Sequence, residues 1–307
     1  MKNYLITGGA GFIGGHLIRK LNKKKNNIIV LDLKNKIIKN KKNLKDCQVI
    51  VGDISKKEIF KKINTNIDTV FHLAAKTSTA VSQKKPSECK KTNIIGTKNL
   101  CDWALRNKPK RIIFTSSMAV YGKMSKNVKE REKLKPISVY GKTKKIGEEL
   151  LLKLKNEGIQ VIVLRLFNVY GPRQNFLNLK QGMLSIYLYQ IYKNQKVKVT
   201  GSLNRSRDLI FIDDVVDALI LSFPKNKNII ANVGTGKPTT VLELIKKIFN
   251  ELKINFTMDK IIKLDGHKGD TFSSFANNRT LRSFYWYPKT SLKAGLKNTI
   301  KDLRKKH

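Results

Sequence analysis

A glycine-rich turn between an apolar strand and a helical segment constrains the fold of this chain more than any other feature. The stretch Thr7–Gly14 (TGGAGFIG) follows the apolar residues Tyr4–Ile6 and leads into a helical pattern. In such a turn Gly8 allows the tight bend, Gly11 lets the backbone approach a pyrophosphate, and Gly14 packs the helix on the strand. The helix N-terminus then offers N–H groups and a positive dipole end to an anion. The pattern predicts a phosphate cradle.

A carboxylate stands at the distance from the glycines that a dinucleotide site requires. Residues 28–31 read as the next strand, and Asp32 ends it, about 20 residues past the turn. A carboxylate there binds ribose hydroxyls and repels a 2′-phosphate, which favours NAD over NADP. The alternative is an ordinary strand–turn–helix with a surface aspartate, and the paired signal argues against it.

Short apolar runs alternate with helical patterns through the first half of the chain. The predicted strands are 3–7, 27–31, 47–51, 68–72, 111–115 and 161–165. Strands separated by crossover helices form a parallel sheet covered on both faces, with right-handed connections. The expected fold is therefore α/β, a doubly wound parallel sheet of the Rossmann type.

The pattern changes after residue 166, where Gly171-Pro172 interrupts the chain before helical patterns at 177–194 and 239–251. No clean linker or repeat separates the halves. We expect an NAD-binding domain over 1–166, with 209–232 returning to it. Segments 167–208 and 233–307 then form a smaller, interwoven substrate lobe. Ligands of such sheets bind at the carboxyl ends of the strands.

Length and composition are those of a globular protein rather than of a membrane protein. The chain has 307 residues, of which 40% are hydrophobic, and no apolar run reaches the ~18 residues that span a bilayer. The first predicted strand begins at residue 3, so no signal peptide is expected. The three cysteines and four histidines lack metal or disulfide spacing. We expect a cytoplasmic protein without a metal site or a membrane partner.

The net charge of +41 is extreme, and two interpretations remain open. Lysines are spread along the whole chain among asparagines, which favours a compositional bias of the source genome. Aromatic residues are not interleaved with them as nucleic-acid stacking platforms require. A nucleic-acid-binding protein on a dehydrogenase scaffold is the alternative from a different class. In either case we expect non-specific, salt-dependent binding of polyanions.

A tyrosine, a lysine and a serine carry the pattern of proton-transfer chemistry. Tyr140 and Lys144 are four residues apart at the start of a predicted helix, hence one turn apart on one face. An ammonium near a phenol favours the phenolate and lowers the phenol pKa, so that the tyrosine can act as a base. Ser117 follows the carboxyl end of the predicted strand 111–115 and can bind the oxygen that loses the proton.

These features occur together with other motifs in a recognisable order. The motifs are Gly52-Asp53-Ile54, Phe71-His72-Leu73-Ala74-Ala75, Asn93-x-x-Gly96-Thr97, Thr115-Ser116-Ser117-x-x-Val120-Tyr121-Gly122, Tyr140-x-x-x-Lys144, Arg165-x-Phe167-Asn168-Val169-Tyr170-Gly171-Pro172 and Arg207-Asp208-x-x-x-Ile212-x-Asp214. The chain resembles the extended short-chain dehydrogenase/reductase family, in its NAD-dependent nucleotide-sugar epimerase/dehydratase branch. The resemblance covers residues 1–300 and is most specific over the first 172.

The resemblance implies a role for each matching position. The implied catalytic residues are Ser117, Tyr140 and Lys144. The implied NAD-binding residues are Gly8, Gly11, Phe12, Ile13, Gly14, Asp32, Asp53, Ile54, Leu73, Ala74, Ala75, Asn93, Thr115, Tyr140, Lys144 and Phe167. The implied substrate-binding residues are Thr77, Ser117, Asn168, Arg207 and Asp270. Simpler readings remain open, in which Phe167 is core, Asn93 lies on a helix surface and Arg207 is a solvated charge.

Within the resembled branch, the residues after the active serine favour one reaction. Dehydratases and decarboxylases of the branch carry acidic residues there, whereas this chain has Met118 and Ala119, which cannot transfer protons. We therefore expect C4 epimerisation of a nucleotide sugar, most simply a UDP-hexose, through a 4-keto intermediate. A dehydratase or 4-keto reductase is the alternative. His267 stands where the branch often has a diphosphate-binding arginine.

The resemblance also implies a homodimer. In the branch, helices corresponding to 87–106 and 138–157 form a four-helix bundle between subunits. Leu150, Leu151 and Leu154 are apolar positions in the second segment. The alternative is that these helices only cover the sheet.

Overall fold

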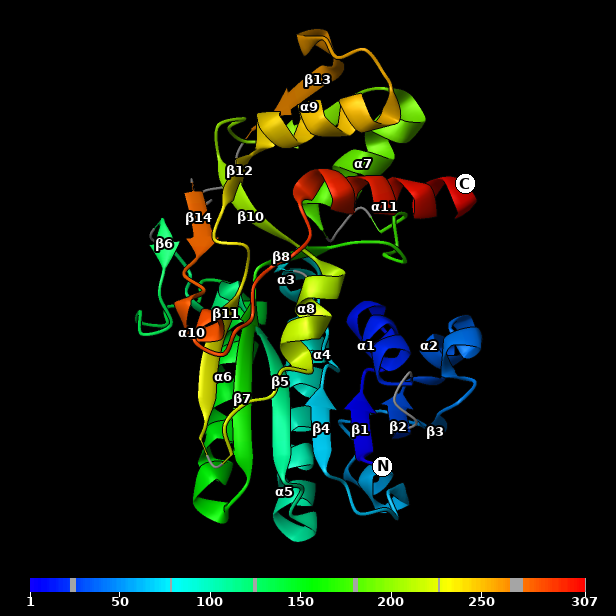
Figure 1. The fold of residues 1–307 in the computed structure, drawn as a ribbon, viewed down its shortest axis with the longest axis vertical. Coiled ribbons are helices and arrows are strands. Elements are labelled where there is room, and N and C mark those ends of the chain that lie inside the picture. The colour runs from blue at the N-terminus through cyan, green and yellow to red at the C-terminus, as the bar shows by residue number, and fades with distance from the viewer. Residues whose placement is uncertain are drawn as a thin grey trace. The chain divides into compact units, whose positions relative to one another are not determined.

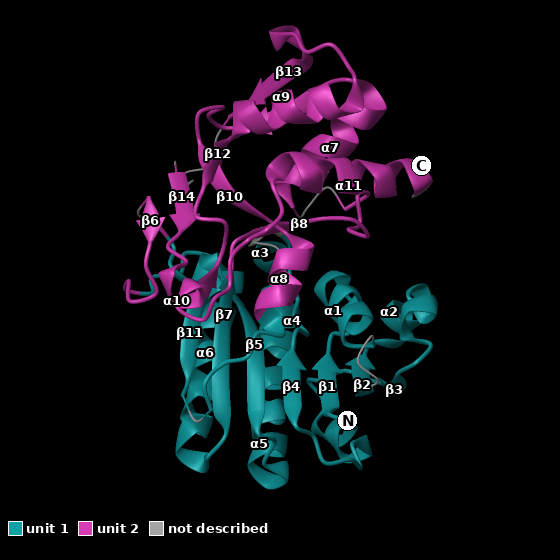
Figure 2. Ribbon diagram, in the orientation of Figure 1, with its two compact units in different colours: residues 1–122, 134–165, 219–231 teal, residues 123–133, 166–218, 232–307 magenta. Residues whose placement is uncertain are grey.

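The computed structural model describes residues 1–22, 26–77, 79–123, 126–178, 182–225, 227–265 and 273–306. It divides into two units (Figure 2): residues 1–122, 134–165 and 219–231 form unit 1, and residues 123–133, 166–218 and 232–307 form unit 2. The segment that returns to unit 1 is shorter than the predicted 209–232. The reason is that residues 209–211 pair with residues 168–170 inside unit 2.

Unit 1 contains most of the predicted alternation of strands and helices (Figure 1). Its strands are β1 (Asn3–Thr7), β2 (Asn27–Asp32), β3 (Gln48–Val51), β4 (Thr69–His72), β5 (Arg111–Ser117), β7 (Gln160–Leu166) and β11 (Ile229–Val233), the last two of which end in unit 2. Its α-helices are α1 (Phe12–Asn22), α2 (Lys34–Lys39), α3 (Thr79–Lys84), α4 (Pro86–Lys90), α5 (Gly96–Asn107) and α6 (Val139–Leu152). Shorter helical turns are η1 (Lys41–Leu44), η2 (Lys57–Lys62), η3 (Lys91–Ile95), η4 (Met118–Val120) and η5 (Lys153–Glu157).

These strands form a 7-stranded sheet in the order β11-β7-β5-β4-β1-β2-β3. Neighbours from β3 through β5 pair in parallel, and the order reverses direction beside β1. The predicted doubly wound α/β sheet is confirmed, and each of the six predicted strands is present within two residues of its predicted bounds. The carboxyl ends of β1, β4 and β5 therefore lie at one edge of the sheet, where ligands of such folds bind.

Alternating side chains along the strands supply the core of unit 1. Leu5, Ile29 and Leu31 pack in one cluster with apolar residues of α5 and with Leu151 and Leu154. Successive strand side chains point to opposite faces, so the buried Ile6 and Val30 face the other side. There the backbone of Gly9 closely approaches both side chains. The two faces of the sheet are thus covered by different helices, as the parallel topology requires.

Unit 2 is built from short strands and four helices of eight or more residues among those described. Its strands are β6 (Asn127–Val128), β8 (Asn168–Tyr170), β9 (Val197–Thr200), β10 (Ser206–Phe211), β12 (Pro238–Thr240), β13 (Ile261–Leu264) and β14 (Ser273–Ala276). Its helices are α7 (Met183–Asn194), α8 (Ile212–Leu219), α9 (Val241–Leu252), η6 (Met258–Lys260), α10 (Arg279–Arg282) and α11 (Leu292–Lys306). Helix α7 begins later than the predicted 177, because Gly182 just before it has a φ of +83° that no helix allows.

A buried carboxylate joins the strands of unit 2. Asp208 on β10 is fully buried, and its Oδ2 accepts hydrogen bonds from the N–H groups of Gly236 (2.9 Å) and Ala276 (3.0 Å). Its Oδ1 accepts from the N–H of Thr235 at 2.8 Å. A buried carboxylate is costly unless its oxygens are satisfied, so the Thr235–Gly236 turn and strand β14 are both held to β10.

Candidate active site

The glycine turn has the geometry that a pyrophosphate cradle requires. Gly8 lies in the left-handed region, with a φ of +73°, and a Cβ there would come within 2.6 Å of the N of Ala74. A Cβ on Gly14 would come within 2.6 Å of the Cα of Gly9. Only glycine fits either position, so the backbone is free of side chains where α1 begins. The first-turn N–H groups of α1 have no acceptor within the helix, which suits a bound diphosphate.

Asp32 ends β2 beside this turn. Its Oδ2 accepts a hydrogen bond from the N–H of Ala10 at 3.0 Å, and its Oδ1 accepts from the N–H of Leu33 at 2.8 Å. Partial burial raises the pKa of Asp32, while the two N–H donors and the Lys36 ammonium oppose that shift. The carboxylate thus supports the glycine turn, and each oxygen keeps acceptor capacity for a ribose hydroxyl.

A buried histidine connects the glycine turn to the segment after β4. The Thr97 hydroxyl donates to the carbonyl of Asn93 at 2.6 Å, so it accepts from His72 Nε2 at 2.9 Å. His72 Nδ1 is then the acceptor for the Thr7 hydroxyl at 2.7 Å. Burial and the nearby Lys144 ammonium lower the pKa of His72 to about 3. A neutral imidazole therefore joins β1, β4 and α5.

Asn93 lies on the π-helical turn η3 and binds two segments at once. Its Oδ1 accepts from the N–H of Lys76 at 2.8 Å, and its Nδ2 donates to the Lys76 carbonyl at 3.1 Å. The same Nδ2 donates to the Thr143 hydroxyl of α6 at 2.9 Å. Asn93 is 3% exposed, so it is not a helix-surface residue. It fixes α6 relative to the segment after β4.

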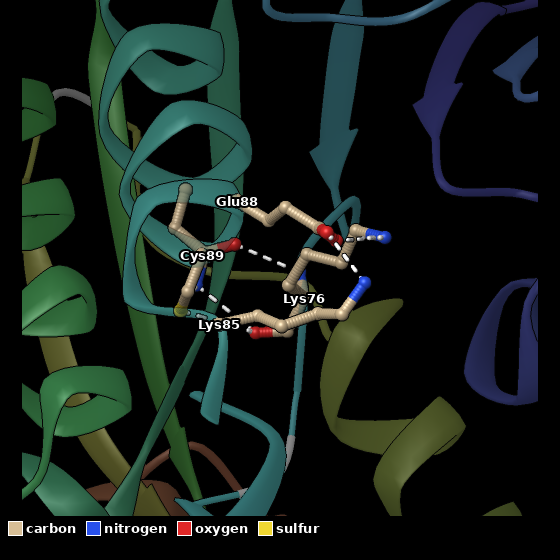
Figure 3. A network of polar contacts seen from close by, with 5 residues as sticks. Lys76, Lys85, Glu88 and Cys89 are labelled. Carbon is tan, nitrogen blue, oxygen red and sulfur yellow. Dashed lines mark hydrogen bonds and ion pairs between the residues drawn. The ribbon is translucent and has the colours of Figure 1, made fainter. Parts of the chain in front are cut away.

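Figure 3 shows how the far end of that segment is tied to α4. The ammonium groups of Lys76 and Lys85 approach the Glu88 carboxylate at 3.6 and 2.8 Å. The Cys89 thiol donates to the Lys76 carbonyl at 3.8 Å. The ion pairs are exposed and contribute little stability. The backbone at Lys76 is instead held by the buried Asn93 and Cys89.

Helix α6 starts with a side-chain cap and a close approach to β5. The Ser138 hydroxyl accepts from the N–H of Gly141 at 3.0 Å, which satisfies one free donor of the first turn. A Cβ at Gly141 would collide with the carbonyl oxygen of Ala119. The absence of a side chain there lets the first turn of α6 contact the segment that follows β5. The cap and the glycine thus place Tyr140 beside Ser117.

Tyr140 is half-buried, and its hydroxyl is hydrogen-bonded to Ser117. The Ser117 Oγ also accepts from the N–H of Ala119 at 3.2 Å. Burial raises the pKa of Tyr140 to about 12, although the Ser117 hydrogen bond acts in the opposite direction. The expected lowering of this pKa by Lys144 is therefore corrected: in the protein by itself, desolvation dominates.

Lys144 is buried and its ammonium is held by β5. Its Nζ donates to the carbonyl of Thr115 at 2.8 Å and lies 4.6 Å from the ring centroid of Phe114. Burial lowers the pKa of Lys144 to about 8. The ammonium is thus oriented by a strand carbonyl and an aromatic ring.

The remaining predicted cofactor residues of unit 1 lie at or near the carboxyl ends of the strands. Ile54 is buried against Gly96, and Asp53 Oδ1 accepts from the N–H of Ser55 at 2.9 Å. Ala74 donates its N–H to the Thr7 hydroxyl at 3.4 Å. Leu73, Ala74 and Ala75 are half-buried, Phe12 and Ile13 are half-buried in the first turn of α1, and Thr77 is exposed.

Three of the predicted site residues that the structure describes lie in unit 2. Asn168 donates its Nδ2 to the carbonyl of Asp208 at 2.9 Å, one residue from Arg207. Arg207 is half-buried, and its NH1 donates to the Ser206 carbonyl at 2.8 Å. Phe167 is buried, with its N–H bonded to the Val233 carbonyl at 3.0 Å. Asp270 and His267 lie outside the described residues.

Sequence reasoning missed the buried polar groups behind these residues. In the sequence, His72 is only part of an apolar motif, and no motif assigns a role to Glu148. In the structure, the Glu148 carboxylate is hydrogen-bonded to Arg165 and Ser116. The available signal was spacing, because Glu148 is four residues beyond Lys144 and so lies on the same helix face.

Other features of the described residues do not bear on this site. A shallow hollow of about 240 Å³ in unit 2 is lined by residues that include Lys237, Asn278, Arg279 and Arg282, and none of the predicted site residues lines it. Within the described ranges, no cluster of three or more His, Cys, Asp and Glu side chains could hold a metal ion. Among the same residues, no helix is long and apolar enough to cross a membrane.

Comparison with known proteins finds similar sequences and structures over nearly the whole chain. The model of the NAD-dependent epimerase/dehydratase family matches residues 4–234. A Methanocaldococcus jannaschii protein proposed to be a UDP-glucose 4-epimerase is 34% identical over 302 residues, which are 96% of each chain.

Two solved structures are similar over nearly the whole chain. A Thermotoga maritima UDP-glucose 4-epimerase with UDP-glucose is 34% identical, with a TM-score of 0.90 and coverage of 99% of each chain. A Methanobrevibacter ruminantium UDP-N-acetylglucosamine 4-epimerase in complex with UDP-N-acetylmuramic acid is 30% identical, with a TM-score of 0.91. That match covers 100% of this chain and 99% of the other.

Proposed function

Because this chain belongs to the NAD-dependent epimerase/dehydratase family, we propose that it interconverts the C4 epimers of a UDP-hexose through a 4-keto intermediate. The observation that carries the proposal is the hydrogen-bonded pair Ser117–Tyr140 with Lys144 one helical turn away, in the unit that also contains the glycine cradle. The similarity of the whole chain to UDP-sugar 4-epimerases supports the choice of substrate.

The side chains would act in the following way. The glycine cradle would hold NAD, which would supply the hydride acceptor and donor for C4 of the sugar and a positive nicotinamide ring that would favour the phenolate. Tyr140 takes the proton of the 4-hydroxyl and later gives it back, while Ser117 holds the sugar oxygen. Lys144 would bind a nicotinamide-ribose hydroxyl, and Asp32 the adenosine ribose. Asn168 would bind the substrate diphosphate and Arg207 a phosphate or the uridine ribose, so that the sugar can turn without leaving.

The two residues that follow Ser117 favour epimerisation over elimination. Met118 and Ala119 form the helical turn η4 after Ser117, and neither can expel water or handle a C5 proton. A dehydratase or 4-keto reductase remains the alternative within the family.

Incubation of the purified protein with a panel of UDP-sugars and no added cofactor tests the proposal. The panel includes UDP-glucose, UDP-N-acetylglucosamine and UDP-glucuronic acid. A C4 epimer at equilibrium supports the proposal, and an absorbing 4-keto-6-deoxy product indicates the dehydratase. A protein with bound NAD that converts none of these sugars refutes the assignment.

We further propose that the protein is a cytoplasmic homodimer, from the family resemblance. The three cysteines are free thiols, in keeping with a reducing compartment. Leu151 and Leu154 do not support the dimer, because both are buried in the core of unit 1. The exposed Ile95 and Leu105 are better candidates for an interface. Sedimentation of wild type and an Ile95→Lys variant tests this.

A further inference from the structure

Helix α6 carries a second charged residue on the face that holds the catalytic pair. Tyr140, Lys144 and Glu148 are spaced by four residues, so they lie along one stripe of the helix. Lys144 is 3% exposed and Glu148 is 2% exposed. A charged side chain is costly to bury unless it is paired and hydrogen-bonded. The stripe therefore requires partners from neighbouring strands.

Arg165 at the end of β7 is the main partner of Glu148. Its Nε lies 3.0 and 3.2 Å from the two carboxylate oxygens, and its NH2 lies 2.7 Å from Oε2. Its NH1 donates to the Tyr121 hydroxyl at 3.0 Å, and the guanidinium lies 5.0 Å from the centroid of that ring. This side-on pairing fixes the orientation of the carboxylate.

The carboxylate faces the end of β5, where each of three consecutive residues is bonded to α6. The Thr115 carbonyl accepts from Lys144 Nζ, the Ser116 hydroxyl bonds to Glu148 Oε1, and Ser117 bonds to the Tyr140 hydroxyl. Ser116 is 2% exposed. Three turns of one helix thus set the position of the strand end that carries the catalytic serine.

We infer that Glu148, oriented by Arg165, is a positioning residue of the catalytic centre, which fixes the Ser116–Ser117 segment on α6 and places a negative charge one helical turn beyond Lys144. Its kinetic consequence rests on the proposed function. Its electrostatic consequence does not.

The electrostatic consequence concerns the ammonium of Lys144. The titratable or charged groups around it are Cys89 of α4, His72 of β4, Tyr140 and Glu148 of its own helix, and Arg165 of β7 behind Glu148. His72 is neutral, because its pKa is about 3. Burial lowers the pKa of Lys144, and Cys89 and Glu148 both oppose that effect. If Glu148 were neutral, Arg165 would add an uncompensated positive charge and lower the pKa further.

The test compares Glu148→Gln with Glu149→Gln in the full-length protein. Glu149 is the next residue on the same helix, but it is 57% exposed and only pairs with Lys145 at 3.7 Å, so it is the matched control. Lysine labelled with 13C at Cε is titrated by NMR, and Lys144→Met identifies the Lys144 signal. We expect a midpoint near pH 8 in wild type and in Glu149→Gln. We expect it lower by about 1 pH unit in Glu148→Gln.

A double variant separates electrostatics from simple unfolding. Glu148→Gln with Arg165→Met removes both charges, which costs less stability than leaving one unpaired. We expect its Lys144 midpoint to lie between those of Glu148→Gln and wild type. An unchanged Lys144 midpoint in Glu148→Gln overturns the inference. The inference also fails if neither Glu148→Gln nor the double variant folds, because the Glu148–Arg165 pair would then be purely structural.

Epimerase kinetics provide the second measurement. The alkaline limb of kcat should move to lower pH in Glu148→Gln by the same amount as the NMR midpoint, whereas Glu149→Gln should follow wild type. If wild type converts no UDP-sugar, the proposed function fails and the NMR titration still decides the inference. If wild type is active while Glu148→Gln keeps the wild-type Lys144 midpoint and the wild-type alkaline limb of kcat, only the inference fails.

Discussion

At the residue scale, the proposed catalytic centre depends on the balance between burial and charge. Burial raises the pKa of Tyr140 to about 12 and lowers that of Lys144 to about 8. Both pKa shifts favour the neutral side chains. The protein without a ligand therefore does not stabilise the Tyr140 phenolate. A positive charge next to Tyr140 would oppose the first shift, and the nicotinamide ring of bound oxidised NAD would supply one.

The Lys144 pKa predicts the alkaline limit of activity. The ammonium is present below pH 8 and is lost as the pH rises through about 8, although a solvent-exposed lysine stays charged to about 10.4. We therefore expect kcat to fall above pH 8, in a profile measured from pH 6 to 10 at saturating UDP-sugar. A rate that stays constant to pH 10 would mean that the Lys144 charge is not required.

At the element scale, the site depends on how closely α6 approaches β5. Gly141 touches the backbone of Ala119, and Gly147 has its Cα against the ring of Phe114, where a Cβ would come within 2.9 Å of Cζ. These glycines let three side chains of the helix reach three consecutive residues of the strand end. The helix position is thus set by absent side chains as well as by hydrogen bonds.

Gly141→Ala should displace the first turn of α6. The new methyl group meets a backbone oxygen that cannot move aside cheaply, so we expect about 1–3 kcal/mol of lost stability and a large loss of kcat. Thermal unfolding and epimerisation rates measure the two effects. Gly15→Ala in α1 is the control, because its added methyl group meets no atom within 4 Å apart from its chain neighbours and the backbone of its own helix. It should gain up to about 1 kcal/mol from helix propensity.

The elements themselves could be predicted from the sequence much better than their polar connections. Apolar runs such as Ile112–Phe114 and the turn at Gly8 follow local rules, and the structure has both. The bonds of Glu148 to Ser116 and Arg165 join residues 32 and 17 positions apart, which no local pattern encodes. The sequence pattern predicts a lowered pKa for Tyr140, whereas burial raises it. Burial depends on the whole fold, so no local pattern encodes it either.

At the scale of the whole molecule, the net charge of +41 should appear as weak, salt-dependent binding to polyanions. Binding to single-stranded RNA, followed by fluorescence anisotropy, should fall steeply between about 50 and 200 mM salt, because counterion release drives it. The affinity should be the same for RNAs of different, random sequence. Tight binding to one RNA sequence at physiological salt would favour the nucleic-acid alternative instead.

The family, the sheet and the glycine cradle all lead to one central claim, that the Tyr140 phenol is the base and acid of the reaction. The most direct test is the epimerisation rate of Tyr140→Phe at pH 7.5, with the content of bound NAD measured in the same preparation. We predict a loss of at least about 100-fold in kcat, because a phenylalanine ring cannot take up or return the proton, with NAD retained. A Tyr140→Phe variant that epimerises UDP-sugars at the wild-type rate would contradict the account.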